Sequence, residues 1–182
     1  TDLLFYTVLI SAAFFLFFIT LKELLIKKSN NFSQTIAHFG FSLLILSILF
    51  NNILSSEITT NMKSGEKYKY SKGEIFLKKI EEKKDSNFTS ITAFFEIKDE
   101  KGVIVELKPE IRIYNQPITI TSEADIKTTL LEDKFLVMSL VKGNEYFNIR
   151  YQVKPFMIWI WVSVLLLSFG GLMSLFTNKY EK

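Results

Sequence analysis

Three stretches of the chain are long, apolar and free of charged residues, at residues 3–21, 35–54 and 156–176. At 1.5 Å of rise per residue, a helix over residues 3–21 is about 28 Å long, which is enough to cross the hydrocarbon core of a bilayer. A single run of this kind is also compatible with a core helix of a globular protein. Three such runs in one short chain predict three transmembrane helices.

The region between the second and third stretches has a different pattern. Short runs of alternating or continuous apolar residues are separated by turn sequences rich in Lys, Asp, Asn and Gly. The predicted strands cover residues 73–80, 88–98, 102–108, 110–114, 117–122, 134–141 and 145–153. Residues 123–133 are expected to form a loop or a short helical turn. This pattern predicts an antiparallel β-sandwich or barrel-like domain between the second and third helices.

The lysines in the short loops predict the orientation in the membrane. Residues 22–34 carry three lysines and the tail 178–182 carries two, so the positive-inside rule puts both segments on the cytoplasmic side. We therefore predict two transmembrane helices with a cytoplasmic loop in residues 1–54, an exported domain in 55–154, and a third helix with a cytoplasmic tail in 155–182. The expected location is the bacterial inner membrane with a periplasmic domain, or the mitochondrial inner membrane if the gene is organellar.

Composition excludes several function classes. Basic and acidic residues nearly balance in residues 55–154, so this region has no electrostatic footprint for nucleic acid. The chain has no cysteine, which excludes disulfides, a thiol nucleophile and a thiolate metal site. The carboxylates of the predicted domain are scattered, and Arg112 is expected to be a satisfied surface residue. No catalytic residue can be assigned.

His38 is the only histidine, and it lies inside the second predicted span, about 5 Å or one turn from its cytoplasmic end. Gln34 and Ser42 lie four residues before and after it, which predicts a short polar stripe on one helix face. Gly40 would let a flat ligand or a neighbouring helix approach closely. Three hypotheses stay open for His38: an interhelical hydrogen bond, a proton relay, and an axial ligand to haem iron.

The junction into the third span, residues 150–161, is dense in aromatic and basic side chains. Such residues usually anchor a helix at the membrane interface, although contact with a planar ligand or a partner is an alternative. Pro155 is expected to begin the helix. Gly170, Gly171 and Ser174 are expected to form a small-residue face for helix packing.

Several segments together resemble one known family. They are AHFG at 37–40, MKSGE at 62–66, RIYN at 112–115, TSEADI at 121–126 and YQVKPFMIWIW at 151–161, followed by the glycine pair 170–171. In this order they resemble the CcmF family of cytochrome c maturation proteins. The KPFxxWIW junction is the most specific of these motifs, and the resemblance covers nearly the whole chain.

The resemblance implies a function in haem attachment. CcmF is the membrane core of a haem lyase: it receives haem from the holo-CcmE chaperone and, with CcmH/CcmI-type subunits, joins haem to the CxxCH thiols of apocytochrome c. The family also holds a haem b in the membrane through transmembrane histidines, and this haem is thought to reduce the incoming one. His38 matches one of those histidines, which implies that it is an axial ligand of the haem b iron.

The departures from the family are equally informative. The family's tryptophan-rich exported segment and its exported histidines have no counterpart, because the only tryptophans are Trp159 and Trp161. The chain therefore resembles the C-terminal portion of CcmF, and is expected to need the N-terminal portion for activity and for sharing haem b. Two alternatives stay open: a non-catalytic, membrane-anchored docking module, and a ResB-type cytochrome c assembly subunit, against which the KPFxxWIW junction argues.

Overall fold

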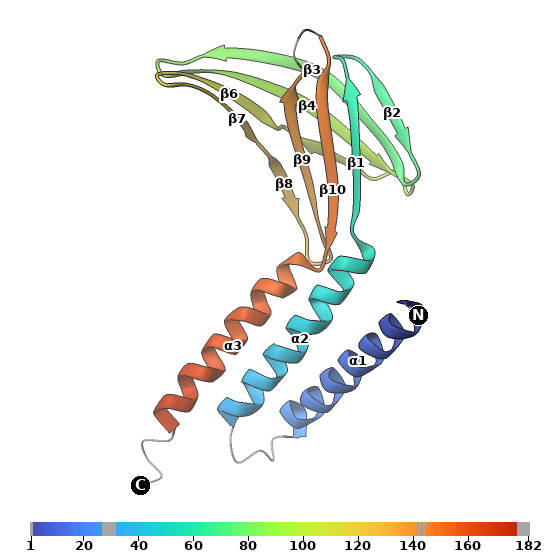
Figure 1. The fold of residues 1–182 in the computed structure, drawn as a ribbon, viewed down its shortest axis with the longest axis vertical. Helices are drawn as coiled ribbons and strands as arrows, with labels where there is room; N and C mark the ends of the chain where they lie inside the picture. The colour runs from blue at the N-terminus through green and yellow to red at the C-terminus, as the bar shows by residue number, and fades with distance from the viewer. Residues whose placement is uncertain (1, 27–31, 142, 144, 178–182) are drawn as a thin grey trace. The chain divides into compact units, whose positions relative to one another are not determined.

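The computed structural model describes residues 2–26, 32–141, 143 and 145–177 (Figure 1). The chain divides into two compact units. The helical unit contains the three helices together with residues 129–133, and the β unit consists of residues 56–128 and 134–153.

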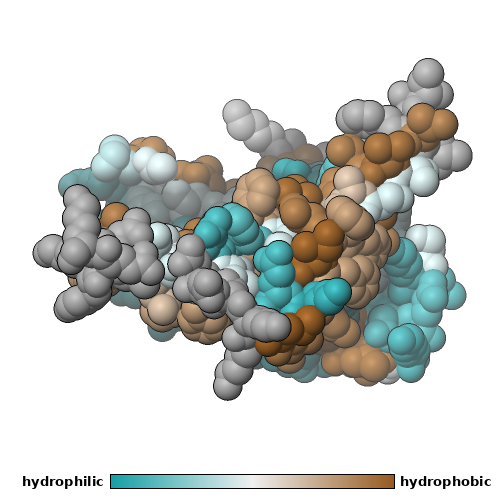
Figure 2. All heavy atoms as spheres, turned by 90° about the horizontal axis from the view of Figure 1, so that it is seen from below, coloured by the Kyte–Doolittle hydropathy of each residue, from teal (hydrophilic) through white to brown (hydrophobic). Residues whose placement is uncertain are grey.

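The helical unit contains α1 (Asp2–Ile26), α2 (Phe32–Leu54) and α3 (Met157–Thr177). Each is long and apolar enough to cross a membrane, which confirms the three predicted transmembrane helices. Many of the side chains that they expose are large and apolar. In the view from below, brown apolar residues lie beside teal polar ones (Figure 2). These helices need a lipid environment, because so much exposed apolar surface would be unstable in water.

The first loop is shorter than expected. We predicted a loop over residues 22–34, but α1 continues through Lys22 and Glu23 to Ile26, and α2 already begins at Phe32. Lysine, glutamate and leucine favour helix, so a helix that leaves the hydrocarbon core can continue for another turn. Two of the lysines used for the orientation, Lys27 and Lys28, lie outside the described residues, as does the tail 178–182.

The β unit is built from two antiparallel sheets. One has the strand order β1–β10–β9–β8, and the other has the order β2–β3–β4–β6–β7, with β5 also paired to β4. The strands are β1 (Ser56–Met62), β2 (Lys67–Tyr70), β3 (Gly73–Lys84), β4 (Phe88–Asp99), β5 (Ile104–Leu107), β6 (Glu110–Asn115), β7 (Ile118–Glu123), β8 (Asp125–Thr128), β9 (Glu132–Leu140) and β10 (Phe147–Pro155). This arrangement confirms the predicted antiparallel sandwich.

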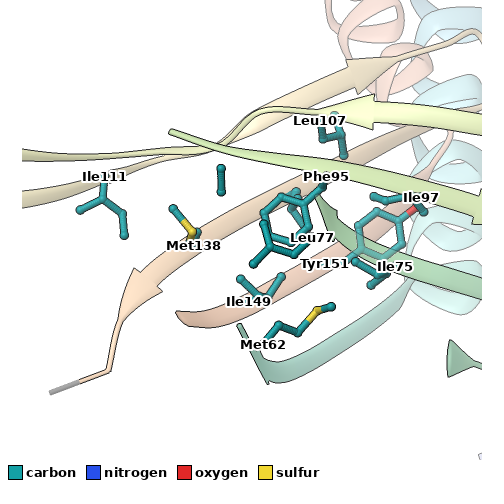
Figure 3. Close-up of a cluster of buried hydrophobic side chains, with 12 residues drawn as sticks. Met62, Ile75, Leu77, Phe95, Ile97, Leu107, Ile111, Met138, Ile149 and Tyr151 are labelled. Atoms are coloured by element: carbon teal, nitrogen blue, oxygen red, sulfur yellow. The ribbon is translucent and has the colours of Figure 1, made fainter. Parts of the chain in front are cut away.

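The core of the β unit lies between the two sheets. Alternate residues of the strands point inward, such as Phe95 and Ile97 of β4, which are almost fully buried against Ile149 and Tyr151 of β10. Figure 3 shows these side chains between the strands. The complete buried cluster is Met62, Ile75, Leu77, Ala93, Phe95, Ile97, Leu107, Ile111, Leu136, Met138, Ile149 and Tyr151.

A β-bulge keeps the inward-facing pattern of β3 in phase with the core. Ile75 and Leu77 are fully buried, and the pairing of β3 with β4 shifts by one residue between Leu77 and Lys79. The extra residue, Lys78, lets Ile80 pack against the core although it lies three residues after Leu77. The predicted strand 73–80 therefore continues to Lys84 instead of ending at the irregularity.

Three strands were not predicted. The expectation of a loop or helical turn at residues 123–133 is wrong, because β8 forms there and β9 begins at Glu132. The strand β2 has the sequence KYKY, and lysine-rich strands are typical of sheet edges, where charge prevents pairing with another chain. In β1 the more buried, alternating positions are Ser56, Ile58, Thr60 and Met62, and two of these four are polar, so its hydrophobic pattern is weak.

Candidate functional site

His38 lies on the surface of α2, six residues after the helix begins, which is about 9 Å along the axis rather than the expected 5 Å. Its side chain is exposed and lines a groove between α1 and α2 with a volume of about 600 Å³. The other lining residues are Ile19, Lys22, Glu23, Ile26, Gln34 and Thr35. The groove thus combines aliphatic walls with one imidazole, one amide, one ammonium and one carboxylate.

The polar stripe expected around His38 divides between two environments. Gln34 is exposed and lies in the groove, whereas Ser42 is completely buried. The Ser42 hydroxyl lies 2.8 Å from the Thr20 hydroxyl of α1 and also donates to the Phe39 carbonyl. The interhelical hydrogen bond at this level is therefore made by Ser42. Within the described parts of the chain, the His38 imidazole has no hydrogen-bond partner.

Close packing against α3 fixes α2 just before and just after His38, through one glycine on each helix. A Cβ on Gly40 would lie 2.9 Å from the Leu167 backbone nitrogen, so Gly40 accommodates α3 and not a flat ligand. From the other helix, a Cβ on Gly170 would lie 2.6 Å from the Ala37 nitrogen. Gly171 has open space around it, so only the first glycine of the predicted pair forms the close contact. This backbone-to-backbone packing holds the turn that carries His38.

The donor set in the groove can supply one nitrogen ligand to a metal centre. Among the residues that the structure describes, no group of three or more His, Asp or Glu side chains is suited to binding a bare metal ion. A single imidazole fits instead an axial position of a metal that is already held by a planar macrocycle. The donors among the described residues would therefore fit one axial position of a haem, with His38 as the ligand.

The aromatic junction makes contacts within the helical unit. Pro155 ends β10 and α3 begins at Met157, so Pro155 does not start the helix as predicted. Between them Phe156 has a φ of 59°, a left-handed conformation that is uncommon for residues other than glycine. This residue turns the chain sharply into the helix. The Asn51 side-chain amide donates to the Pro155 carbonyl at 2.7 Å, which ties the last turn of α2 to the corner.

A second set of contacts at this junction was missed by sequence reasoning. The Trp159 indole N–H donates to the Leu130 carbonyl, and the Phe156 backbone N–H donates to the Leu131 carbonyl, both at 2.8 Å. Both leucine side chains are exposed. The local sequence around Leu130 gave no signal for these bonds, because they join residues that lie far apart along the chain.

In the β unit, Arg112 is only in part the satisfied surface residue that we expected. Its guanidinium donates to Glu110 at 3.1 Å and lies over the Phe88 ring, 5.3 Å from the ring centre. This hydrogen bond is the main reason that the pKa of Glu110 is lower than its ordinary value. The Arg112 Nε, however, is buried without a hydrogen-bond partner among the described residues.

Comparisons with known proteins agree with the fold. The family model described as "CcmF C-terminal beta-sandwich" matches residues 53–155. The cytochrome c-type biogenesis protein ccl1 of Rhodobacter capsulatus is 34% identical over 119 residues, which cover 65% of this chain and 18% of that protein. The cytochrome c-type biogenesis protein NrfE of Haemophilus influenzae is 26% identical over 178 residues, which cover 96% of this chain and 28% of that protein.

Two further comparisons extend this finding. The cytochrome c-type biogenesis protein CcmF of Escherichia coli is 27% identical over 146 residues, covering 80% of this chain and 23% of that protein. A solved structure named Cytochrome c Heme Lyase CcmF has a TM-score of 0.62 at 17% identity, and covers 86% of this chain and 27% of that chain. That similarity shows a shared fold. The chain spans less than a third of the length of each of these proteins.

Proposed function

The chain belongs to the CcmF family, and from this membership we propose that it is the C-terminal part of a haem lyase in cytochrome c biogenesis. The match of residues 53–155 to the family's C-terminal β-sandwich carries the proposal, because it covers the whole domain between α2 and α3. The curated relatives are named as cytochrome c-type biogenesis proteins, which supports the same pathway. The chain's contribution would be to support covalent attachment of haem to the CxxCH thiols of apocytochrome c.

The proposed activity depends on partners. The chain spans 18% to 28% of its relatives, so the N-terminal portion of CcmF is the first partner we propose. The chain has no cysteine, so both thiols of the thioether bonds have to come from the apocytochrome. The remaining proposed partners are CcmH/CcmI-type subunits and the holo-CcmE chaperone. The proposed location is the bacterial inner membrane, with residues 55–154 in the periplasm.

His38 is the residue that we assign to haem b in this proposal. Its imidazole lies at the surface of α2, lines a groove of about 600 Å³ and has no hydrogen-bond partner among the described residues. An imidazole that makes no hydrogen bond has a ring nitrogen whose lone pair is free to bind haem iron at an axial position. When bound, a haem b supplies one-electron redox chemistry within the membrane. The second axial ligand would come from the N-terminal portion.

The surrounding residues support this role by fixing the helices. Gly40 and Gly170 hold α2 against α3, and the pair of hydroxyls at Thr20 and Ser42 holds α2 against α1. The α-helix that presents His38 is therefore held from two sides, as a coordinating side chain requires. Among the described residues that line the groove, Lys22 is the cation, and it would balance the negative charge of a haem propionate.

The optical spectrum of the chain, purified with its N-terminal partner, tests the haem assignment. We expect a b-type Soret band in the wild type and its loss in His38→Ala, because the variant has no axial nitrogen at this position. Gln34→Leu is the matched control, since it changes the same groove without removing a nitrogen ligand. Retention of an unchanged spectrum in His38→Ala, with the partner still bound, would refute the assignment.

Cytochrome c maturation in a strain that lacks this chain tests the function itself. We expect no covalent haem on c-type cytochromes until the chain is restored. If the cytochromes mature without the chain, the lyase proposal is wrong and a docking role remains. If maturation requires the chain but His38→Ala restores it fully, only the haem assignment is wrong.

A further inference from the structure

The turn between β8 and β9 has an unusual composition. Thr129 and Glu132 close the turn, with the Thr129 N–H donating to the Glu132 carbonyl at 3.0 Å. The two positions between them are occupied by Leu130 and Leu131, whose side chains are 68% and 69% exposed. Turn positions in water usually carry Gly, Asn, Asp, Ser or Pro, each for a conformational reason that leucine does not share. We call residues 129–132 the leucine turn.

The leucine turn is fixed to the beginning of a transmembrane helix. Leu130 and Leu131 each accept a 2.8 Å hydrogen bond, from the Trp159 indole N–H and from the Phe156 backbone N–H respectively. Residues 129–133 accordingly belong to the helical unit rather than to the β unit. The position of the turn relative to α3 is therefore set by two specific bonds, one from Trp159 in the first turn of the helix and one from Phe156 directly before it.

The length of α3 places its first turn at the hydrocarbon boundary. The apolar span Met157–Phe176 has 20 residues, and a helix needs about 20 residues to cross the hydrocarbon core. Trp159 is the third residue of this span, at the level where tryptophan is enriched in membrane proteins. A turn bonded to the Trp159 side chain lies at the same level. At the adjoining end of α2, Ile53 and Leu54 are also about half exposed.

Most backbone polar groups of the leucine turn are hydrogen-bonded. The Leu130 and Leu131 carbonyls are both hydrogen-bonded, and the Thr129 hydroxyl accepts from the Glu132 N–H at 3.1 Å. The same hydroxyl donates to the Glu132 carbonyl at 2.8 Å. An unpaired backbone group is costly in lipid, so these hydrogen bonds lower the cost of inserting the turn.

We propose that the leucine turn inserts Leu130 and Leu131 into the lipid bilayer beside the start of α3. The partner is the acyl-chain region just below the lipid headgroups. Two exposed leucines, fixed by hydrogen bonds at the depth of an interfacial tryptophan, match that environment in polarity and in position. The chain then contacts the bilayer through this turn in addition to its three helices.

Site-directed spin labelling of the full chain tests the proposal. The chain has no cysteine, so Leu130→Cys and Leu131→Cys each give a single nitroxide site. Because both side chains are exposed, a label at either position requires no repacking. The matched control is Ser64→Cys, an exposed residue in the turn after β1. All three variants are reconstituted in nanodiscs of phosphatidylethanolamine and phosphatidylglycerol.

The readout is the collision rate of each label with oxygen and with a water-soluble nickel chelate. We expect the oxygen-to-nickel ratio at positions 130 and 131 to be several-fold higher than at position 64, since oxygen concentrates in lipid. A nickel-dominated ratio at positions 130 and 131 would show that the turn lies in water. Low collision rates with both reagents would show that protein covers it. Either result would overturn the proposal.

Discussion

Gly170 of α3 lies so close to Ala37 of α2 that a methyl group added to Gly170 would come within 2.6 Å of the Ala37 backbone nitrogen. Ala37 directly precedes His38, so this contact helps to determine where the proposed haem ligand lies. A contact between backbones leaves little room for adjustment, because neither atom belongs to a flexible side chain.

We expect Gly170→Ala to destabilise the helical unit by about 1–3 kcal/mol, the usual cost of inserting a methyl group into a packed contact. Gly171→Ala is the matched control, because the space around Gly171 is open. Both substitutions improve helix propensity by about 1 kcal/mol, so their difference isolates the packing effect. Thermal unfolding in detergent, followed by circular dichroism at 222 nm, measures it. Equal stabilities of the two variants would contradict the role of Gly170.

The buried pair of hydroxyls at Thr20 and Ser42 should couple α1 to α2. In a double-mutant cycle of Thr20→Val and Ser42→Ala, we expect an interaction energy of about 0.6 kcal/mol, the average for hydrogen bonds between membrane helices. Denaturant unfolding of the four proteins gives this value. A second cycle that pairs Thr20→Val with Ser11→Ala is the control, since Ser11 bonds only within its own helix. Its interaction energy should be close to zero.

The Glu110–Arg112 pair should make the stability of the β unit depend on pH. The hydrogen bond from Arg112 lowers the pKa of Glu110 below its ordinary value of 4.5. A carboxylate with a lower pKa in the folded state stabilises the fold above its unfolded pKa, and this contribution disappears as the pH falls through the folded value. Wild type should therefore be more stable than Glu110→Gln at neutral pH, and the difference should shrink below about pH 4.5.

Urea unfolding between pH 3 and pH 7, followed by circular dichroism at 218 nm, tests this pH dependence. Glu100→Gln serves as the control, because Glu100 is an exposed turn residue. Its stability should follow that of wild type at every pH. A stability difference between wild type and Glu110→Gln that is independent of pH would rule out the proposed linkage.

Loss of the Trp159 hydrogen bond should loosen the leucine turn. We expect Trp159→Phe to cost about 1 kcal/mol locally, because it removes the indole donor to the Leu130 carbonyl and keeps an aromatic ring. That corresponds to a roughly fivefold faster hydrogen exchange of residues 128–134, measured by mass spectrometry. Trp161→Phe is the control, since the Trp161 side chain is 63% exposed. Equal exchange in both variants would argue against the bond.

The elements with strong local patterns could be predicted from the sequence. The three helices are recognisable because charge-free runs of this length are rare outside membrane spans. The strand β4 is recognisable because apolar residues occupy every second position from Ile91 to Ile97. His38 could be selected because a histidine within an apolar helix is costly and therefore informative. In each case the determining feature lies within one continuous segment.

The features that depend on distant contacts could not be predicted. The strand β1 is defined by its pairing with β10, in which Ser56 lies opposite Val153. The corner at Phe156 depends on hydrogen bonds to Asn51 and Leu131 around it, and the local proline suggested a helix start instead. Helical spacing alone puts Ser42 and His38 on one face of α2. That Ser42 is buried while His38 is exposed could not be predicted, because the burial of Ser42 depends on its contact with Thr20 of α1. Such pairings are not encoded in any one segment's periodicity.

The pairing of β1 with β10 has a consequence for how this protein can change over evolution. The strands that begin and end the β unit are neighbours, so the segment 56–153 starts and finishes side by side, after α2 and before α3. Those two helices already pack together through Gly40 and Gly170. The segment between α2 and α3 could therefore be exchanged for another whose two ends also lie side by side, while α2 and α3 stay packed together, and only the leucine turn of the helical unit would be lost with it.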